Sequence, residues 1–342
     1  MPAEHPALWW RLMLAIVLMV GFYVLALGLA GGLLYLPYAI YKYGRVLHFK
    51  LAILSLLGAA GILWAVLPRF DRFRAPGPPL KPEEHPRLFQ EISGVAGAVG
   101  QPMPVEVYLV PEVNAWVTNR GGVMGLGSRR IMGLGLPLLQ VLSVSEFRAV
   151  LVHEFGHYHG GDTALAPWVY KTRSTIGRTL DQLGGSLLQK PFIWYGNLFL
   201  RLTNAVARKQ EYAADALAAE ITGPDPIITG LKKLYQAGPA FETYWGSELE
   251  PLLANGFLPP LAEGFQAFIR SPEVFLAMQE AMVQEMEQSV PNPYDTHPSL
   301  KDRIAALEKL PAPAMPIEDN PALALVGHVA ELEKELMVLL YG

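Results

Sequence analysis

The chain has 342 residues, of which 51% are hydrophobic, and this content suits one globular domain together with membrane-spanning segments. A formal net charge of -4, without a basic face carrying interleaved aromatic residues, argues against a nucleic-acid partner. The absence of cysteine excludes disulfides and thiolate ligands, so any metal site must be built from histidine and carboxylate side chains.

Two uncharged runs near the N-terminus predict a transmembrane helical hairpin. The first, Leu12–Tyr41, is longer than the about 20 residues that a helix needs to cross a bilayer, and the second, Leu51–Leu67, is near the short end of that range. Tryptophan and tyrosine residues flank the first run, as is common at membrane interfaces. A cleaved signal peptide is the alternative for the first run, but its apolar region would be only about 7–15 residues long.

Basic residues around these runs predict the topology. If both runs span the bilayer, the N-terminus and everything after the second run lie on the same side. That side has four flanking arginines, against three basic residues in the loop between the runs, and this bias favours the cytoplasm. The residues are Arg11, Arg69, Arg72 and Arg74 against Lys42, Arg45 and Lys50. We therefore expect an inner-membrane or plasma-membrane protein whose main domain is cytoplasmic.

A small sheet is predicted after the proline-rich linker Ala75–Pro79. An amphipathic helix is expected from Pro82 to about Val99. Alternation of apolar residues then predicts strands at Val105–Leu109, Asn114–Thr118 and Ile131–Leu134. Because turn residues separate these segments, we expect the strands to form an antiparallel sheet.

The segment 153–157 carries the most informative motif, His153-Glu154-Phe-Gly-His157, which has the form H-E-x-x-H. Ser143 and the glutamate three residues later form a predicted capping box, which would begin a helix about ten residues before His153. Residues four apart share one helix face, so both imidazoles can bind the same zinc ion. Glu154 is placed to accept a proton from water at that ion. A buried helix with two histidines bonded to carbonyl groups is the alternative.

The end of this helix is predicted at Gly160-Gly161. His159 lies two residues past His157, off the face that the two motif histidines share. We expect it to interact with the helix dipole and not to bind metal.

A third metal ligand is predicted at Glu211. Glu211 and Asp215 are four residues apart in the alanine-rich segment Arg201–Glu220, which is expected to form one helix ended by Gly223-Pro224. Two histidines and a glutamate form a common catalytic zinc site, and a carboxylate bonded to a ligating imidazole fixes its orientation. Asp215 would be that partner of His153. A solvent-facing acidic pair is the alternative.

The apolar stretch Pro191–Leu200 is too short to span a membrane alone. We expect it to be a core helix segment, and insertion into the membrane interface is the alternative.

At these motifs the chain resembles the HtpX-like and CAAX-prenyl-protease-like membrane zinc endopeptidases, which are of the gluzincin type. The resemblance rests on H-E-F-G-H at 153–157, E-Y-A-A-D at 211–215 and the segment Asp295–Arg303, and it covers roughly Leu80–Leu310. It implies one Zn²⁺ per chain and a polypeptide substrate. The segment Asn119–Arg130 is longer and richer in glycine than a tight hairpin needs. No obvious membrane-spanning pair separates the two zinc motifs.

The resemblance also implies roles for residues outside the zinc motifs. His297, in a late His-Pro segment that returns to the active site, would stabilise the oxyanion, with an interface histidine as the alternative. Arg303 would hold this segment in place through a carboxylate. Asn114, Ala115 and Trp116 are similar to the edge strand along which related proteases bind the substrate backbone, although Trp116 filling the core of an internal strand is the alternative.

The sequence as a whole predicts an α+β, mainly α, protein. We expect a membrane anchor of two transmembrane helices over residues 1–74 and a zincin-like protease domain, with a zinc-binding helix pair, over 75–310. A linker and a C-terminal docking helix, Ala322–Leu340, would occupy 311–342. The predicted function is that of a membrane-anchored zinc endopeptidase, with membrane-protein quality control as one role. The individual substrate is left open: misfolded membrane proteins, a prenylated C-terminus or one dedicated protein.

Two other functions are considered. An intramembrane protease would have to bury Glu146 and Arg148 of the zinc helix in lipid, which is costly. A catalytically silent scaffold with a structural metal site would have no use for Glu154 as a base.

Overall fold

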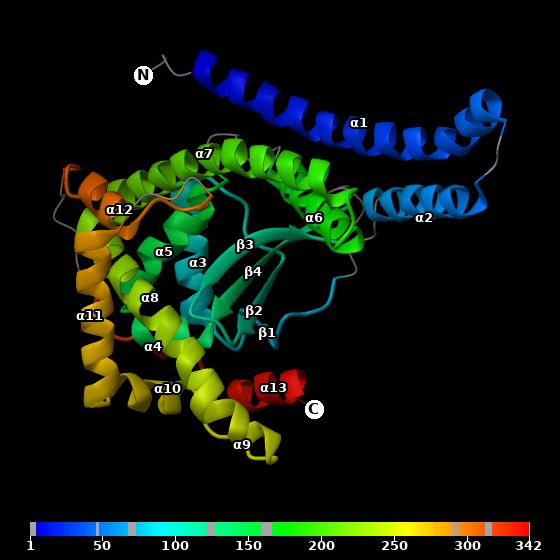
Figure 1. Cartoon of the computed structure of the whole chain (residues 1–342). Coiled ribbons are helices and arrows are strands. Elements are labelled where there is room, and N and C mark those ends of the chain that lie inside the picture. Colours follow the sequence, from blue (N-terminus) through cyan, green and yellow to red (C-terminus); the bar gives the residue numbers. More distant parts are fainter. Residues whose placement is uncertain are drawn as a thin grey trace.

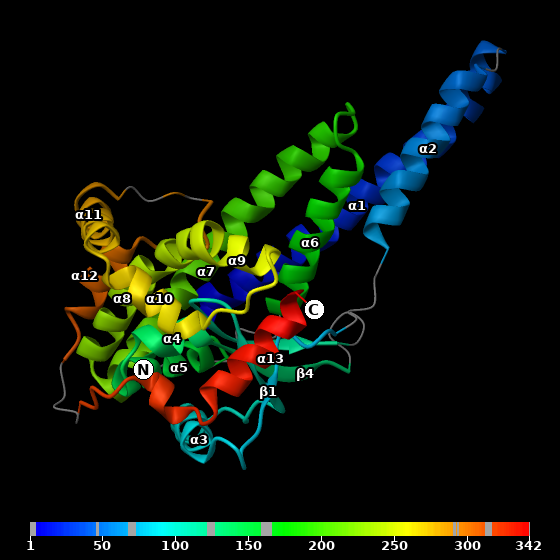
Figure 2. The same ribbon diagram turned by 90° about the horizontal axis from the view of Figure 1, so that it is seen from below.

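The structure is a computed structural model that describes residues 5–45, 48–67, 73–121, 127–158, 166–289, 292, 294–311 and 317–341, apart from the side chains of 5–12, 166–168, 170 and 341. It consists of a long helical arm attached to a mainly helical body that contains one small sheet (Figures 1 and 2). Arg69 and Arg72, which were used to predict the topology, lie outside the described residues.

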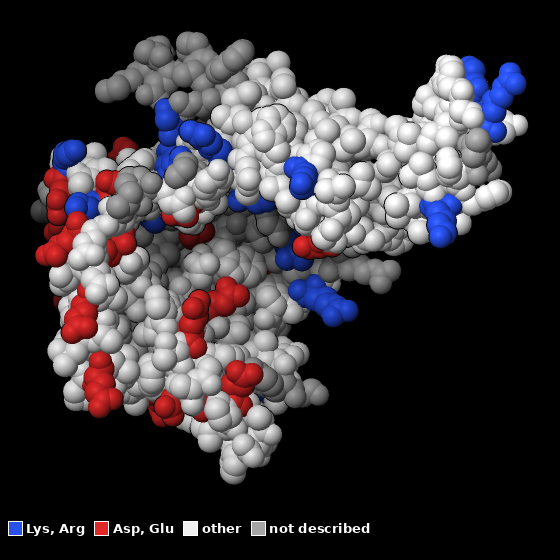
Figure 3. Space-filling model, viewed as in Figure 1, with Lys and Arg blue, Asp and Glu red and all other residues white. Residues whose placement is uncertain are grey.

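The arm is formed by α1 (His5–Gly44) and α2 (Phe49–Val66), which run antiparallel. Both helices are long and apolar enough to cross a membrane, over 32 residues in α1 and 18 in α2. Large apolar side chains such as Val24 and Leu54 point outward and are 64% and 67% exposed. The arm surface in Figure 3 is almost free of charge except for basic side chains at its far end. These features agree with the predicted transmembrane hairpin.

The sheet has four strands in the order β1-β2-β4-β3: β1 (Pro79–Leu80), β2 (Glu106–Val110), β4 (Arg129–Gly135) and β3 (Ala115–Arg120). The two outer pairs are antiparallel, but β2 and β4 are parallel. The prediction of an antiparallel sheet was therefore wrong, and the sheet is mixed. The physical reason is that β4 lies between β2 and β3 in the sheet, where it pairs antiparallel with β3 and parallel with β2. Alternation in the sequence locates strands but does not fix their order. Within the described residues, β3 is an edge strand.

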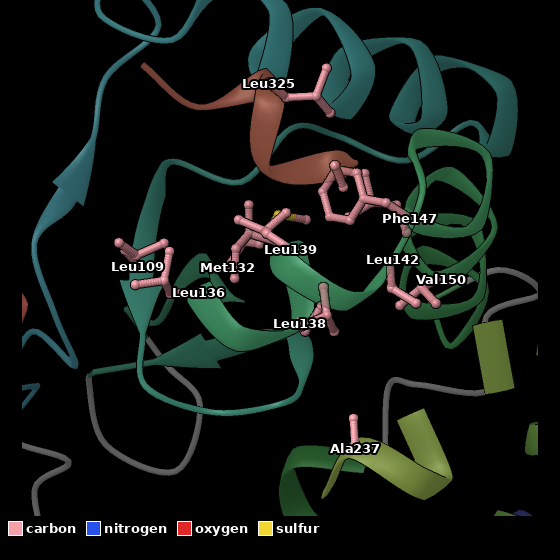
Figure 4. Packing of buried hydrophobic residues seen from close by; sticks show 14 of the residues in the cluster. Leu109, Met132, Leu136, Leu138, Leu139, Leu142, Phe147, Val150, Ala237 and Leu325 are labelled. Atoms are coloured by element: carbon pink, nitrogen blue, oxygen red, sulfur yellow. The ribbon is translucent and has the colours of Figure 1, made fainter. Parts of the chain in front are cut away.

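The core of the body lies between this sheet and the helices α3 (Pro86–Val99), α4 (Leu136–Val141) and α5 (Val144–Gly156). Figure 4 shows apolar side chains from the sheet and from α4 and α5 packed together with one from the C-terminal region. Those labelled there include Leu109, Met132, Leu139, Phe147 and Leu325, all at most 4% exposed. Each such side chain contributes about 1.5–3 kcal/mol of burial free energy, and Phe147 packs α5 onto this core.

The helices α6 (Ala166–Gln182) and α7 (Gln189–Thr222) form a hairpin beside the arm. The helix predicted from Arg201 begins instead at Gln189, so it includes Pro191–Leu200. That stretch packs against α1, where Phe192 and Phe199 form a second core with Phe22. The Tyr195 hydroxyl donates a hydrogen bond of 2.6 Å to the Leu18 carbonyl. The segment Pro191–Leu200 therefore packs against the arm and not in the core of the body.

The remaining helices, from α8 to α13, pack around the sheet and α5. The predicted C-terminal helix is interrupted, since a 3₁₀ turn ends before His328, whose φ of 54° cannot belong to a right-handed helix. The Glu333 carboxylate accepts a hydrogen bond of 2.6 Å from the Ala262 backbone N–H, which docks the last helix on the body. The elements are α8 (Pro224–Tyr244), η2 (Trp245–Leu249), α9 (Glu250–Ala254), α10 (Leu261–Arg270), α11 (Pro272–Gln288), α12 (Leu300–Leu307), η3 (Ala322–Leu325) and α13 (Val329–Tyr341).

Candidate active site

The start of α5 is fixed by the predicted capping box. Ser143 Oγ accepts a hydrogen bond of 3.3 Å from the Glu146 N–H, and the Glu146 carboxylate accepts one of 2.8 Å from the Ser143 N–H. Lys233 of α8 lies 2.6 Å from the same carboxylate. Two otherwise unpaired N–H groups are satisfied in this way, so the helix has a defined first turn and register.

The other end of α5 lies against α7. A Cβ at Gly156 would come within 3.3 Å of Ala214 Cα, so the two helices cross at close range. Ala214 lies between Glu211 and Asp215 in the chain, and this crossing brings both carboxylates beside His153 and His157. The small residues Gly156 and Ala214 therefore allow the close crossing that brings these four side chains together.

Three predicted ligands meet at the crossing. His153 Nε2 lies 3.5 Å from Glu211 Oε2, and His157 Nε2 lies 3.4 Å from Glu211 Oε1. All three ligand atoms are within 4.8 Å of one another. Bonds of about 2.1 Å in tetrahedral geometry place ligand atoms about 3.4 Å apart. The distances from the two ring nitrogens to the carboxylate oxygens are long for hydrogen bonds, and the three residues could hold a metal ion.

Asp215 lies on the other side of the His153 ring. Its Oδ1 is 2.9 Å from His153 Nδ1, a short contact that lies off the ideal direction of a ring N–H bond. Arg303 of α12 donates two hydrogen bonds to the same carboxylate, of 2.8 Å from Nε and 2.7 Å from Nη2. Burial opposes ionisation of Asp215, but the hydrogen bonds from Arg303 and the contact with His153 outweigh it and lower the pKa. The ionised carboxylate leaves Nε2 of His153 facing Glu211.

The electrostatics of the two histidines differ. Burial disfavours the charged form of His153, but its contacts with Asp215 and Glu211 raise the pKa to about 9. Burial and the neighbouring His153 lower the pKa of His157 to about 4. For Glu211, burial is likewise outweighed by contacts with His153 and His297, and its pKa is lowered. The Glu211 carboxylate is therefore ionised and the His157 imidazole is neutral.

Glu154 faces the same cavity as His153. Burial raises the pKa of Glu154 to about 7, although the charges of His153 and His297 oppose this. A carboxylate with a pKa near neutrality can both accept and release a proton at neutral pH.

A loop before α12 brings His297 to the site. His297 Nδ1 lies 3.0 Å from Glu211 Oε2, and its side chain is 62% exposed. Asn204 of α7, which is buried, donates a hydrogen bond of 2.5 Å to the Tyr294 carbonyl. Arg208 donates one of 2.8 Å to the Asp295 carbonyl. The loop is thus attached to the helix that carries Glu211.

A cavity of about 890 Å³ opens beside these residues. Figure 3 shows the body hollowed beneath the arm, with acidic side chains around the hollow. One wall of the cavity is apolar and comes from α5 and α8, and it includes Val150, Ile227, Leu231 and Leu234. The cavity can therefore receive an apolar side chain next to the three ligand atoms.

The predicted substrate-binding residues lie in two different places. Asn114 lines the cavity together with His153 and Glu154. Ala115 is buried on the face of β3 toward the core. Trp116 is only partly buried and covers Gly133 of β4, where a Cβ would overlap the indole. Trp116 thus covers the sheet beside an edge strand. It does not fill the core of an internal one.

Two contributors were not predicted. Asn204 is a buried polar residue in an otherwise apolar part of α7, and this is the signal that could have indicated it. Tyr158 directly follows the His153–His157 motif, and its hydroxyl donates a hydrogen bond to the Val117 carbonyl of β3. Nothing in the sequence indicates this contact. His159 and Gly160-Gly161 lie outside the described residues, whereas α5 ends at Gly156.

Comparisons with known proteins agree with the motifs. The model of peptidase family M48 matches residues 82–311. "Protease HtpX" of Idiomarina loihiensis is 27% identical over 168 residues, or 44% of this chain and 57% of that protein. "Protease HtpX homolog" of Arthrobacter sp. is 26% identical over 245 residues, or 67% and 74%. The crystal structure of S. mikatae Ste24p has a TM-score of 0.33 and 18% identity over 86% of this chain and 67% of that one, which is too distant to support an argument.

Proposed function

The chain belongs to peptidase family M48, and we propose that it is a membrane-anchored zinc-dependent endopeptidase. The proposal depends above all on one observation. His153, His157 and Glu211 each offer one ligand atom, these three atoms lie within 4.8 Å of one another, and two imidazoles with one carboxylate form a donor set that suits zinc. A zinc ion held there would polarise the scissile carbonyl and lower the pKa of water toward about 7.

Glu154 is the proposed general base. Its carboxylate takes a proton from the attacking water and later delivers it to the departing amine. Burial raises the pKa of Glu154 above that of an exposed glutamate, which makes its carboxylate a stronger base. His297 is the proposed donor to the developing oxyanion, since it lies at the same cavity and its side chain is exposed.

Asp215 and Arg303 are proposed to orient His153. The carboxylate contacts Nδ1 of the ring, which leaves Nε2 as the ligand atom. Arg303 holds the carboxylate by two hydrogen bonds and thereby attaches α12 to α7. A partner of this kind fixes both the tautomer and the ring position of a ligating histidine.

The substrate backbone is proposed to bind along β3. An extended peptide can add to a sheet edge through main-chain hydrogen bonds. Ala115 is small, which permits close approach, and the Asn114 amide can donate and accept at the border of the cavity. Binding through the backbone would allow the enzyme to accept many sequences.

The membrane context suggests the substrate class. We propose that residues 1–74 anchor the chain, that 75–310 form a protease domain on the cytoplasmic side, and that 311–342 dock on it. The relatives are named protease HtpX, and for this chain we propose cleavage of membrane proteins during quality control. The short distance between the arm and α7, which carries Glu211, supports action close to the bilayer (Figure 1).

The experiment is hydrolysis of a quenched peptide library by zinc-loaded protein. Glu154→Gln should keep its zinc and its melting temperature but lose about 10²–10⁴-fold in kcat, because the amide cannot accept the proton. Glu280→Gln, an exposed change on α11, is the matched control and should behave as the wild type. Normal turnover by a zinc-loaded Glu154→Gln protein would exclude the proposed role of Glu154. A wild-type protein that binds zinc but cleaves nothing would favour a structural metal site.

A further inference from the structure

The edge strand β3 presents its backbone groups alternately to β4 and to the opposite side, where the described residues place no strand. The Gly135 N–H donates a hydrogen bond of 2.9 Å to the Asn114 carbonyl, so Asn114 faces β4. In antiparallel pairing the direction alternates with each residue, and Trp116 therefore also faces β4. The N–H and carbonyl groups of Ala115 and Val117 consequently face the open edge, where a substrate strand would pair.

One of these outward groups already has a partner. The Tyr158 hydroxyl donates a hydrogen bond of 2.8 Å to the Val117 carbonyl. Tyr158 directly follows His157, at the end of α5, so the bond joins the zinc helix to the edge strand. A peptide N–H that paired with the Val117 carbonyl would have to displace this hydroxyl.

The tyrosine is held on two further sides. The guanidinium carbon of Arg130 lies 4.4 Å from the centre of the Tyr158 ring, a cation–π contact. Gln101 donates a hydrogen bond of 2.9 Å to the Tyr158 carbonyl, and Arg130 donates one of 3.2 Å to the Gln101 side chain. Both the ring and the backbone of Tyr158 are thus fixed, so displacement of the hydroxyl would disturb several contacts at once.

We propose that Tyr158 ends the substrate-binding edge at Val117 and so limits recognition on that side of the cleaved bond to about two peptide residues. This inference rests on the proposed function. The cavity, which Asn114 lines together with His153, Glu154 and Glu211, lies at the Asn114 end of β3. From Ala115 to Val117 the strand advances two residues, about 7 Å, which is room for two residues of a paired chain.

The test uses full-length, zinc-loaded protein in detergent and quenched peptides that share one cleavable core and are lengthened one residue at a time at either end. For the wild type, kcat/KM should stop rising about two residues from the cleaved bond at one end. Tyr158→Phe keeps the ring under Arg130 and removes only the hydroxyl. For this variant, the next residue at that end should raise kcat/KM about 2- to 10-fold further, because one backbone hydrogen bond is added. The variant's dependence on peptide length at the other end should match that of the wild type.

Tyr108→Phe is the matched control. It also removes a hydroxyl from the sheet, one that donates to Glu106 on β2, away from the edge. It should follow the wild-type length profile. A Tyr158→Phe protein with the wild-type profile, or with an equal loss on peptides of every length, would overturn the proposal and assign the tyrosine a structural role.

A second measurement uses the wild type alone and applies even if Tyr158→Phe loses zinc or unfolds. Single N-methyl groups are placed along the peptide. Methylation beyond the limit should leave cleavage unchanged, whereas methylation of the amide that pairs with Ala115 should reduce it. A loss of cleavage on methylation beyond the limit would refute the proposal. A zinc-loaded wild type that cleaves no peptide would overturn the proposed function, and this inference with it.

Discussion

Substitution of Asp215 should change zinc affinity and folding stability by two different mechanisms, which can be measured separately. Its carboxylate contacts His153 at 2.9 Å and receives two hydrogen bonds from Arg303. In Asp215→Ala the imidazole loses the group that orients it, and zinc affinity should fall about 10–100-fold, or about 1.4–2.7 kcal/mol. The variant also leaves the Arg303 guanidinium buried without its main partner, which typically costs about 3–5 kcal/mol of folding stability.

The two effects can be told apart with a second substitution. Arg303→Met added to Asp215→Ala removes the unpaired charge, so it should recover much of the lost stability but none of the lost zinc affinity. Zinc affinity is measured by competition with a chromophoric chelator, and stability by urea unfolding of the zinc-free protein. Wild-type zinc affinity in a folded Asp215→Ala protein would refute the proposed orientation of His153. Recovery of zinc affinity in the double variant would refute it as well.

Three further predictions concern the groove, the C-terminus and the arm. Asn114→Ala should lower kcat/KM for peptides without loss of zinc or melting temperature; unchanged peptide kinetics would place the substrate elsewhere. Burial raises the pKa of Glu333, so ionisation of this carboxyl opposes folding. The contribution of Glu333 to folding stability is fully present below about pH 4.5 and is lost as the pH rises through the folded-state pKa. Glu333→Gln should therefore be more stable than the wild type at pH 7, as urea unfolding measures, and equal stability there would contradict this. Deletion of residues 1–74 should release the protein from alkali-washed membranes but expose Phe192 and Phe199, so that it needs detergent to stay in solution. Membrane association of the truncated protein that survives alkali would show that the α6–α7 hairpin inserts by itself.

The local features of the site could be predicted because each depends on a short spacing. The capping box before α5 is a contact over three residues, and the sharing of a face by His153 and His157 follows from four residues of helix. The same spacing places Glu211 and Asp215 together on α7. Helical periodicity thus predicts which side chains share a face.

What the sequence did not predict depends on contacts between distant segments. The parallel pairing of β2 with β4 follows from the path of the chain and not from alternation within either strand. The packing of Pro191–Leu200 on α1 and the bond from Tyr158 to Val117 join residues 177 and 41 positions apart. Such pairs are selected by the shape of the folded chain, and no local pattern encodes them.

The central claim is that His153, His157 and Glu211 hold the zinc ion on which peptide hydrolysis depends. The most direct test is metal content together with endopeptidase activity after chelation and re-addition of zinc, for the wild type and for Glu211→Ala. We predict one zinc per wild-type chain, loss of activity on chelation and its return with one equivalent of zinc, and neither zinc nor activity in the variant. Stoichiometric zinc in Glu211→Ala, or full activity of the zinc-free wild type, would contradict the account.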